Sequence, residues 1–368
     1  MKRLTYISRF SPNISQEEIE EIGRLSKRNN KQRNITGVLL CLGGMFFQIL
    51  EGEVEEIDRL YEKILGDTRH TDILCLKSEL NVTERLFPEW SMEIINLDEN
   101  TDLFIQPIKT LLQNVTESHL ILKEYTQPTI LKIIQQGINP LEVRPKKTEK
   151  IVVFSDIVGF SVFADKLPVE HIVFLTDYYL SICSKIISEA GGEVNKFIGD
   201  CIMAYFDTDQ ADEAIQAGLD ILLQVATLRS AAEEDSPLKV LYSGIGITKG
   251  VVIEGNLGSQ VKKDYTIIGD VVNAASRLEA LSRTLPRSLV FSEAVKNSTK
   301  KTWDFVNMGS YKVKGKIDEI EVYSIDGEIT YKSSDRQQLA REITEYLDNI
   351  MNQTFQTREK MQDYLKLL

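Results

Sequence analysis

The stretch GGEVNKFIGDCIMAYF, residues 191–206, predicts two apolar strands joined by a tight turn at Gly199-Asp200. Six apolar side chains fit a largely buried β-hairpin, namely Val194, Phe197, Ile198, Ile202, Ala204 and Phe206. Lys196 and Asp200 do not fit that environment, because charged side chains are seldom buried without partners. A cation and a carboxylate in an otherwise dry segment therefore indicate a functional site.

A second carboxylate lies in KIVVFSDIVGFSVFA, residues 150–164, where Asp156 interrupts a buried strand. Taken singly, Asp156 or Asp200 is most simply a turn residue at the end of a strand. Two such carboxylates that meet across a sheet would repel each other unless a divalent cation lay between them. Oxygen ligands with no His or Cys nearby suit Mg²⁺ or Mn²⁺ rather than zinc.

A third segment, DYTIIGDVVNAASRLE at residues 264–279, predicts a strand that turns into a helix. Asn273 and Arg277 are four residues apart, so they lie on one helical face. An amide and a guanidinium on a mostly apolar helix suit an anion or a developing negative charge. The simpler alternative is a solvated face. Lys314 in VKGK, residues 313–316, is most simply a surface lysine when it is taken alone.

Four segments in the same order resemble the signature segments of class III nucleotidyl cyclases: FSDIVGFS, GGEVNKFIGDCIMAYF, DYTIIGDVVNAASRLE and VKGK. The resemblance covers residues 150–325. It implies a palm-like ferredoxin core and a homodimer with active sites at the subunit interface. It also implies two bound Mg²⁺ (or Mn²⁺) ions, which turn a nucleoside triphosphate into a cyclic nucleotide and pyrophosphate.

The same resemblance implies roles for eight residues. The catalytic set is Asn273, Arg277 and Lys314, the adenine-reading pair is Lys196 and Thr266, and the metal ligands are Asp156, Asp200 and the Ile157 carbonyl. Lysine donates to a ring-nitrogen acceptor of adenine, and the threonine hydroxyl accepts from its amino group, so ATP is the expected substrate. A hydroxyl also donates, which leaves residual GTP use open. The turn GGEVNKF is superficially similar to that of diguanylate cyclases, but Glu193 and Val194 replace their carboxylate pair.

Residues 1–98 alternate in the order βαββαββ, which predicts a ferredoxin-like α+β domain with two helices on one face of the sheet. Tyr6 lies in the first strand. Gln48, in the strand MFFQIL, shares a face with Phe46 and Leu50 by the period of two. A buried glutamine needs partners for its donor and its acceptor. A Tyr6–Gln48 hydrogen bond inside an ordinary core is the simplest interpretation.

The segments LTYIS, NNKQRNITGVLLCLGGMFFQILEGE, ILCLKSEL and FPEWSMEIINLD resemble a BLUF domain, a blue-light receptor. The resemblance implies a noncovalent flavin, FAD or FMN, between the two helices and the sheet. Tyr6 and Gln48 match the photochemical pair: excited flavin takes an electron and a proton from the tyrosine, and the glutamine rearranges. Asn30 matches a residue that bonds the flavin ring, while Trp90 and Met92 match the last strand, where the signal leaves the pocket.

Together the two resemblances imply a blue-light-activated adenylyl cyclase. We expect a BLUF domain at 1–98, a helical linker and handle at 99–148, the cyclase domain at 149–326 and a helical tail at 327–368. The linker predicts a dimer seam that contains Leu103, Leu111, Leu112 and Val115. Two alternatives remain open: a cyclase that light hardly regulates, and a light-dependent binding module without turnover.

The net charge of −12 disfavours nucleic acid or an anionic membrane as a partner. The longest apolar run is too short to span a bilayer, and the first residues enter a strand pattern directly, without a signal peptide. Four cysteines without C-x-x-C spacing indicate buried thiols in a reducing compartment. We therefore expect a cytoplasmic homodimer that acts on ATP and makes no direct contact with downstream cyclic AMP receptors.

Overall fold

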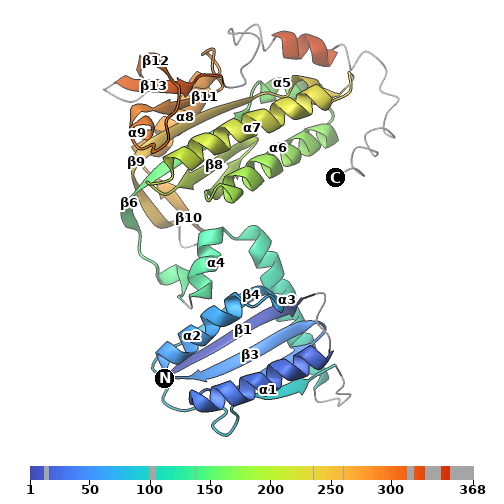
Figure 1. The fold of residues 1–368 in the computed structure, drawn as a ribbon. Helices are drawn as coiled ribbons and strands as arrows, with labels where there is room; N and C mark the ends of the chain where they lie inside the picture. The colour runs from blue at the N-terminus through green and yellow to red at the C-terminus, as the bar shows by residue number, and fades with distance from the viewer. Residues whose placement is uncertain are drawn as a thin grey trace. The chain divides into compact units, whose positions relative to one another are not determined.

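The computed structural model describes residues 1–11, 16–98, 105–136, 138–234, 236–259, 261–312, 319–327 and 341–348. The chain divides into two compact units, Met1–Arg144 and Pro145–Leu368 (Figure 1). The finer division into sensor, linker, catalytic domain and tail stays a prediction. None of the helices in the described ranges is both long and apolar enough to cross a bilayer.

The first unit has the predicted βαββαββ order. Its elements are β1 (Lys2–Phe10), α1 (Gln16–Gln32), β2 (Thr36–Leu42), β3 (Met45–Gly52), α2 (Val54–Leu65), β4 (His70–Glu79) and β5 (Glu93–Asn96). The strands form one sheet in the order β4-β1-β3-β2-β5, in which only the β2–β5 pair is parallel. The fold class predicted from the sequence is therefore confirmed for this unit.

Both helices cover one face of this sheet. Tyr6 and Phe46 from the strands share one buried cluster with Ile22 of α1 and Ile57 of α2. Two further helices follow, α3 (Gln106–Tyr125) and α4 (Pro128–Gln135), and Pro128 begins the second one because proline fits the first helical turn. Leu112 of α3 is half-buried and lines a pocket beside β1 and β3, and its place in a dimer seam stays a prediction. Leu103 lies outside the described residues.

The second unit is built on a larger mixed sheet. Its elements are β6 (Lys146–Ile157), α5 (Phe160–Lys166), α6 (Val169–Glu189), β7 (Glu193–Ile198), β8 (Cys201–Phe206), α7 (Ala211–Ala231), β9 (Ser243–Gly258), β10 (Lys263–Ile268), α8 (Asp270–Ser282), β11 (Leu289–Ser292), α9 (Glu293–Lys296), β12 (Phe305–Lys312) and β13 (Glu319–Ile325). A short 3₁₀ turn at Pro237–Val240 precedes β9, and another at Pro140–Glu142 ends the first unit. The strand order is β12-β13-β11-β9-β6-β8-β7, and β10 pairs with β9.

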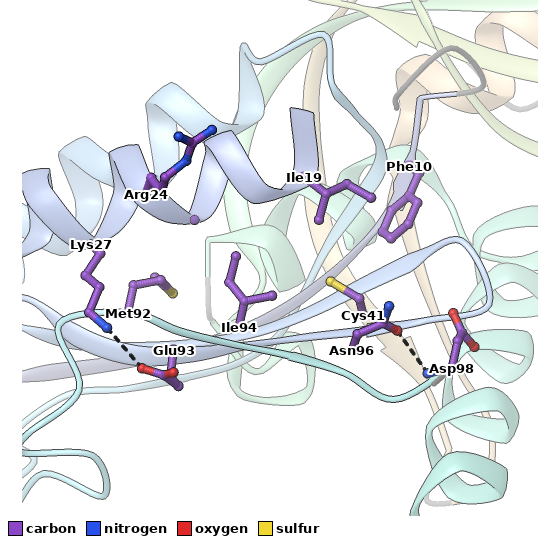
Figure 2. Close-up of a pocket in the computed structure, with 11 residues that line it drawn as sticks. Phe10, Ile19, Arg24, Lys27, Cys41, Met92, Glu93, Ile94, Asn96 and Asp98 are labelled. Atoms are coloured by element: carbon purple, nitrogen blue, oxygen red, sulfur yellow. Dashed lines mark hydrogen bonds and ion pairs between the residues drawn. The ribbon is translucent and has the colours of Figure 1, made fainter. Parts of the chain in front are cut away.

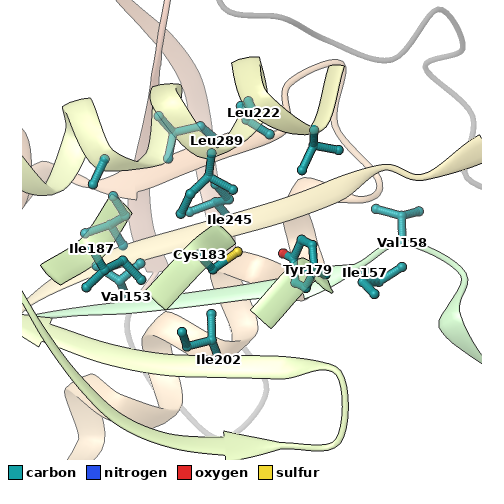
Figure 3. Packing of buried hydrophobic residues seen from close by; sticks show 14 of the residues in the cluster. Val153, Ile157, Val158, Tyr179, Cys183, Ile187, Ile202, Leu222, Ile245 and Leu289 are labelled. Carbon is teal, nitrogen blue, oxygen red and sulfur yellow. The ribbon is translucent and has the colours of Figure 1, made fainter. Parts of the chain in front are cut away.

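Helices α6 and α7 lie side by side over one face of this sheet (Figure 1). Between helices and sheet lies the largest core cluster, in which Cys183 and Ile187 of α6 pack on Val153 of β6 and Ile202 of β8 (Figure 3). A second buried cluster, with Val152 of β6 and Met203 of β8, lies on the opposite face, so these strands are apolar on both faces. The core therefore fixes the ends of β6 and β8, where the predicted carboxylates lie.

Two details differ from the sequence-based expectation. The hairpin 193–206 is present, but Phe197 and Ile198 are each 53% exposed, because β7 is the edge strand of the sheet. The strand β6 begins at Lys146 rather than Ile151, since the charged residues 146–150 pair in register with the far half of β9. Backbone pairing with the long strand β9 thus extends β6 beyond the part that its apolar side chains predict.

Candidate active site and flavin site

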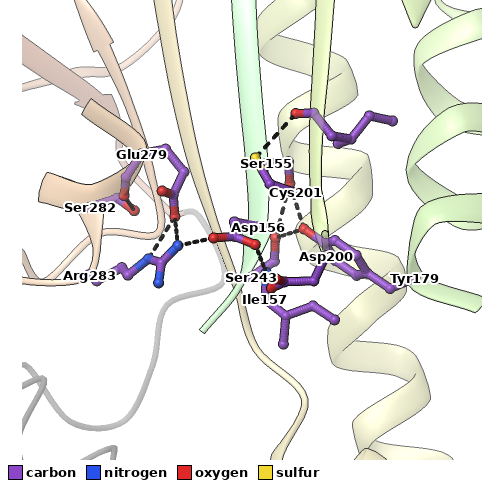
Figure 4. A network of polar contacts seen from close by, with 11 residues as sticks. Ser155, Asp156, Ile157, Tyr179, Asp200, Cys201, Ser243, Glu279, Ser282 and Arg283 are labelled. Atoms are coloured by element: carbon purple, nitrogen blue, oxygen red, sulfur yellow. Dashed lines mark hydrogen bonds and ion pairs between the residues drawn. The ribbon is translucent and has the colours of Figure 1, made fainter. Parts of the chain in front are cut away.

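The two predicted carboxylates meet at the ends of β6 and the β7–β8 hairpin. Asp156 is the penultimate residue of β6, and Asp200 follows Gly199, whose left-handed φ of 66° makes the tight turn. The Ile157 amide donates to Asp156 Oδ1 at 3.0 Å and to Asp200 Oδ2 at 3.3 Å (Figure 4). One N–H thus serves two carboxylates, which confirms that the fold brings them together.

This arrangement is electrostatically costly for the two acids. Burial, together with the hydrogen bond and the charge of the adjacent Asp156, raises the pKa of Asp200 to about 8. A cation between the carboxylates would relieve the repulsion. Within the described ranges no group of three or more His, Cys, Asp or Glu side chains is arranged to hold a metal. The two carboxylates that meet here suit hard cations that keep waters or bind a second oxygen-rich ligand.

A cationic side chain that the sequence analysis did not single out also reaches this pair. Arg283 donates through Nη2 to Asp156 Oδ2, and its Nε lies 2.7 Å from Glu279 Oε1 (Figure 4). Asp156 pairs in register with Gly244 of β9, and a Cβ on Gly244 would lie 3.0 Å from Glu279 Oε1. The missing side chain therefore gives the end of α8 room to bring Arg283 to the carboxylates.

Beneath Asp156 lies a closed group of three hydroxyls. Ser155, Tyr179 and Ser243 are mutually within 2.6–3.1 Å and are buried (Figure 4). Each hydroxyl both donates and accepts in such a triangle, so no polar group is left unsatisfied. The triangle ties β6, β9 and α6 together directly behind the carboxylate and fixes its backbone.

The predicted adenine-reading pair lies in a separate part of the unit. Lys196 on β7 is half-buried, with its Nζ 4.0 Å from Asp264, and Thr266 on β10 is buried. Between them lies Asn195, whose Oδ1 accepts a hydrogen bond from the Thr266 hydroxyl at 2.7 Å. The fold therefore does bring Lys196 and Thr266 together, through a neighbour that the sequence analysis did not name.

The remaining predicted catalytic residues are Asn273 and Arg277 on α8, and Lys314. Asn273 is exposed and Arg277 half-exposed, on the face of α8 opposite its buried residues. No hydrogen bond or ion pair joins either side chain to Asp156, Asp200 or the adenine-reading pair in the described parts of the chain. Lys314 lies outside the described residues. A single copy of the chain thus presents these groups separately.

In the first unit, Tyr6 and Gln48 are direct cross-strand neighbours on β1 and β3. The Tyr6 hydroxyl donates to Gln48 Oε1, and Gln48 Nε2 donates to Met92 Sδ at 3.4 Å. Burial, reinforced by Tyr61 and Asp67, raises the pKa of Tyr6 far above its ordinary value, so the phenol keeps its proton. Tyrosine, glutamine and methionine therefore form one buried chain of donors and acceptors.

The placement of the last strand differs from the prediction. β5 begins at Glu93, so Trp90 and Met92 precede it rather than lie within it. Met92 is buried, whereas Trp90 is partly exposed and stacks on Phe87 with ring centroids 5.2 Å apart. Glu51 of β3 accepts hydrogen bonds from the backbone of this segment, including the Phe87 amide at 3.1 Å. These bonds explain why an irregular segment can lie along the sheet before pairing begins.

Two buried polar atoms on the helices that cover the first sheet have no hydrogen-bond partner among the described residues: Nδ2 of Asn30 on α1 and the hydroxyl of Tyr61 on α2. The Tyr61 ring lies 5.6 Å from the Tyr6 ring. Unsatisfied buried polar atoms are rare in folded proteins, and each calls for a physical explanation. Donors left open on both helices, beside the buried Tyr6, fit a ring system that carries carbonyl and ring-nitrogen acceptors, as a flavin does.

A separate pocket of about 460 Å³ lies between α1 and the segment that carries Met92, Glu93 and Ile94 (Figure 2). Its lining includes Ile19 and Arg24 of α1 and Met92, and at its rim Lys27 Nζ lies 3.3 Å from Glu93 Oε2. Tyr6, Asn30 and Gln48 do not line it. This pocket therefore contacts the buried donor chain only at its methionine end.

The sequence analysis missed Asn195, Glu279, Arg283 and Tyr61 as parts of these sites. Glu279 and Arg283 are four residues apart at the end of a predicted helix, a spacing that predicts an ion pair. Arg283 and Asp156 are 127 residues apart in the sequence, so no local sequence pattern predicts their contact.

Comparison with known proteins assigns both units. The BLUF family, described as sensors of blue light using FAD, matches residues 1–93, and the adenylate and guanylate cyclase catalytic domain matches residues 143–327. Among solved structures, a bacterial light-regulated adenylyl cyclase is 52% identical with a TM-score of 0.86, over 95% of this chain and 99% of that one. A second structure of a bacterial light-regulated adenylyl cyclase is 51% identical with a TM-score of 0.83, over 94% of this chain and 100% of that one.

Curated proteins named as photoactivated cyclases are also similar to this chain. Photoactivated adenylate cyclase subunits alpha and beta of Euglena gracilis are each 30% identical over 79% of this chain, which spans 29% and 34% of their respective lengths. The resemblances stated from the sequence motifs are confirmed. The chain belongs to the family of adenylyl and guanylyl cyclases that carry a BLUF sensor of blue light ahead of the catalytic domain.

Proposed function

We propose that this protein converts ATP to 3′,5′-cyclic AMP and pyrophosphate under the control of blue light. The observation that carries the proposal is the meeting of Asp156 and Asp200 on one amide, in a chain whose other unit holds the Tyr6–Gln48–Met92 chain. The light-regulated enzymes to which the chain is similar support it over nearly its full length.

In the proposed reaction the ribose 3′-hydroxyl attacks the α-phosphate, a new P–O bond closes the ring, and the bond to pyrophosphate breaks. Two Mg²⁺ or Mn²⁺ ions, when bound, would lower the pKa of the ribose 3′-hydroxyl, which loses its proton, and would neutralise charge on the leaving pyrophosphate. Asp156, Asp200 and the Ile157 carbonyl would hold them. Asn273 would orient the ribose and Arg277 would stabilise charge on the α-phosphate. Lys314 would meet the terminal phosphates.

For the sensor we propose a noncovalent flavin, FAD or FMN, which absorbs blue light and accepts an electron and a proton. Tyr6, buried and protonated, would supply both. The Nδ2 group of Asn30 would donate a hydrogen bond to the flavin ring. The match to the family of blue-light sensors using FAD supports this cofactor class. Gln48, held between Tyr6 and Met92, would change its hydrogen bonds and pass the change to the segment that carries Trp90.

We further propose a homodimer in which one subunit supplies the metal carboxylates and the other the base-reading and phosphate-contacting residues. Within the described residues of one copy, no hydrogen bond or ion pair joins Asn273 or Arg277 to the carboxylates, which supports this. Exposed apolar residues also support a dimer, because soluble monomers seldom expose large contiguous apolar patches. In α3, Ile108, Leu111, Leu122 and Tyr125 are exposed and lie on one side of the helix by its period of 3.6 residues. In the second unit, the exposed Phe197 and Ile198 lie between Lys196 and Asp200 in the sequence.

The proposal is tested by measuring cyclic AMP from ATP and Mg²⁺ in the dark and under blue light, with the absorption spectrum recorded alongside. We expect a yellow protein with a small reversible red shift and turnover that rises in light. Tyr6→Phe should keep dark turnover and lose the light response. Asp156→Asn should keep the spectral shift and lose turnover. Equal turnover in light and dark would leave an unregulated cyclase, and a spectral shift without turnover would indicate a binding module.

A further inference from the structure

A hydrogen bond between two edges of the second unit concerns the choice of base. Thr266 lies on β10, which pairs only with β9 in the described ranges, whereas Asn195 lies on the edge strand β7. The Thr266 hydroxyl donates to Asn195 Oδ1 at 2.7 Å, and the two residues are 6% and 3% exposed. Water therefore does not compete for this hydroxyl proton.

The orientation of the Asn195 amide is set by a second contact. Its Nδ2 donates to the Tyr265 carbonyl oxygen at 3.4 Å. In the flipped orientation Oδ1 would face that carbonyl, and two acceptors would meet in a buried place. Asn195 therefore presents an acceptor to Thr266, and the single hydroxyl proton of Thr266 is committed to it. What Thr266 retains is its oxygen lone pairs.

A β-bulge places Asn195 beside Lys196. In the β7–β8 ladder Val194 lies opposite Ala204 and Lys196 lies opposite Met203, so the register skips Asn195. Ala204 packs in the cluster under the helices, whereas Met203 packs in the cluster on the opposite face, with Val152 of β6 and Ile267 of β10. Asn195 bonds to residues of β10, so it lies on the same face as Lys196. Two consecutive polar side chains thus share one face, as a bulge permits.

We propose that Asn195 is a specificity-determining positioning residue, which makes Thr266 an obligatory hydrogen-bond acceptor and so favours ATP over GTP. The inference rests on the proposed function, in which Lys196 and Thr266 read the base. Adenine presents a ring-nitrogen acceptor to the Lys196 ammonium and an amino donor to the Thr266 oxygen. Guanine in the same pose presents a protonated ring nitrogen and a carbonyl, so that donor faces donor and acceptor faces acceptor.

The test is the ratio of kcat/KM for ATP to that for GTP in the full-length protein under blue light. In Asn195→Leu the Thr266 hydroxyl can rotate and donate to the guanine carbonyl, so the ratio should fall about tenfold. Asn195→Gln keeps both an amide oxygen that accepts from Thr266 and an amide NH2 group that donates to the Tyr265 carbonyl, and it should retain the ratio within about twofold. Melting temperature and flavin spectrum verify folding. Asn195→Ala replaces Asn195→Leu if the latter does not fold, and competitive binding of α,β-methylene ATP and GTP replaces turnover if activity is lost.

A matched background separates the inference from a general structural effect. In the Thr266→Asp variant the carboxylate carries no proton at neutral pH, so it accepts a hydrogen bond from the base whichever residue stands at position 195. Adding Asn195→Leu to this variant should therefore leave the ratio unchanged. An equal fall in both backgrounds, or no fall in either, would overturn the role of Asn195. If Lys196→Ala and Thr266→Val both leave the ratio unchanged, the base-reading assignment in the proposed function is wrong, whatever Asn195 does.

Discussion

Arg283, at the end of α8, donates a hydrogen bond to Asp156, at the end of β6, and so places a fixed positive charge on one of two neighbouring carboxylates. Both side chains are mostly buried, and Glu279 holds the guanidinium from its other side at 2.6 Å. Where a divalent cation is absent, this arginine offsets part of the repulsion between Asp156 and Asp200.

We expect Arg283→Met to lower the stability of the metal-free protein by about 1–3 kcal/mol, because a charge-assisted hydrogen bond is lost and Glu279 stays buried. It should also enlarge the stabilisation that Mg²⁺ provides, since the ion no longer competes with a fixed cation. The measurement is thermal unfolding in EDTA and in Mg²⁺, with Arg283→Lys as the control that keeps the charge. Equal Mg²⁺ responses in wild type and Arg283→Met would contradict this account.

Asp200→Asn should make the metal-free protein at least as stable as wild type while it abolishes cyclic AMP formation. The carboxamide removes one of two like charges that share the Ile157 amide, whereas catalysis is proposed to need both carboxylates. Unfolding in EDTA and isothermal titration with Mn²⁺ measure the two effects. An unchanged Mn²⁺ affinity in Asp200→Asn would show that this carboxylate is not a metal ligand.

Asn30→Leu should bind flavin about tenfold more weakly, since one hydrogen bond contributes about 1–1.5 kcal/mol. The flavin-free protein should lose no stability, because the buried Nδ2 has no partner to lose. Flavin release followed by fluorescence gives the affinity, and chemical unfolding of the flavin-free protein gives the stability. The exposed neighbour supplies the control, Asn29→Leu, for which neither quantity should change.

The first unit should lose stability as the pH falls below the ordinary histidine pKa of 6.5. Burial lowers the pKa of His70, whose Nδ1 lies 2.8 Å from Ser8 Oγ, so the folded state favours the neutral ring. A group with a depressed pKa of this kind contributes stability above pH 6.5, and that contribution is lost as the unfolded chain gains a proton first. The unfolding temperature between pH 7.5 and 5.5 should fall more in wild type than in His70→Gln, and parallel curves would exclude His70 as the cause.

Leu111→Glu should weaken self-association at least about tenfold, because Leu111 is 63% exposed within the apolar stripe of α3 and a charge there would have to be desolvated at an interface. Sedimentation velocity across a concentration series measures the change. Thr110→Glu places the same charge one residue away, off the stripe, and should leave the association intact. A monomeric wild type would refute the proposed dimer outright.

The sequence by itself determined the elements and the pairs of residues that local rules connect. Apolar alternation with glycine turns predicted the βαββαββ order, and the period of two placed Gln48 with Phe46 and Leu50 on the face that the structure buries. The helical period placed Asn273 and Arg277 together. These predictions succeeded because strand and helix periods depend on backbone geometry alone.

Only the tertiary structure decided which distant groups meet. The period of two would put Asn195 and Lys196 on opposite faces, and the bulge that reverses this depends on pairing with β8. The contact of Arg283 with Asp156 depends on Gly244 leaving space between α8 and β6. Phe197 and Ile198 look buried by composition and are exposed because β7 is an edge strand. Pairing partners and packing neighbours lie far away in sequence, so the local pattern of residues carries no record of them.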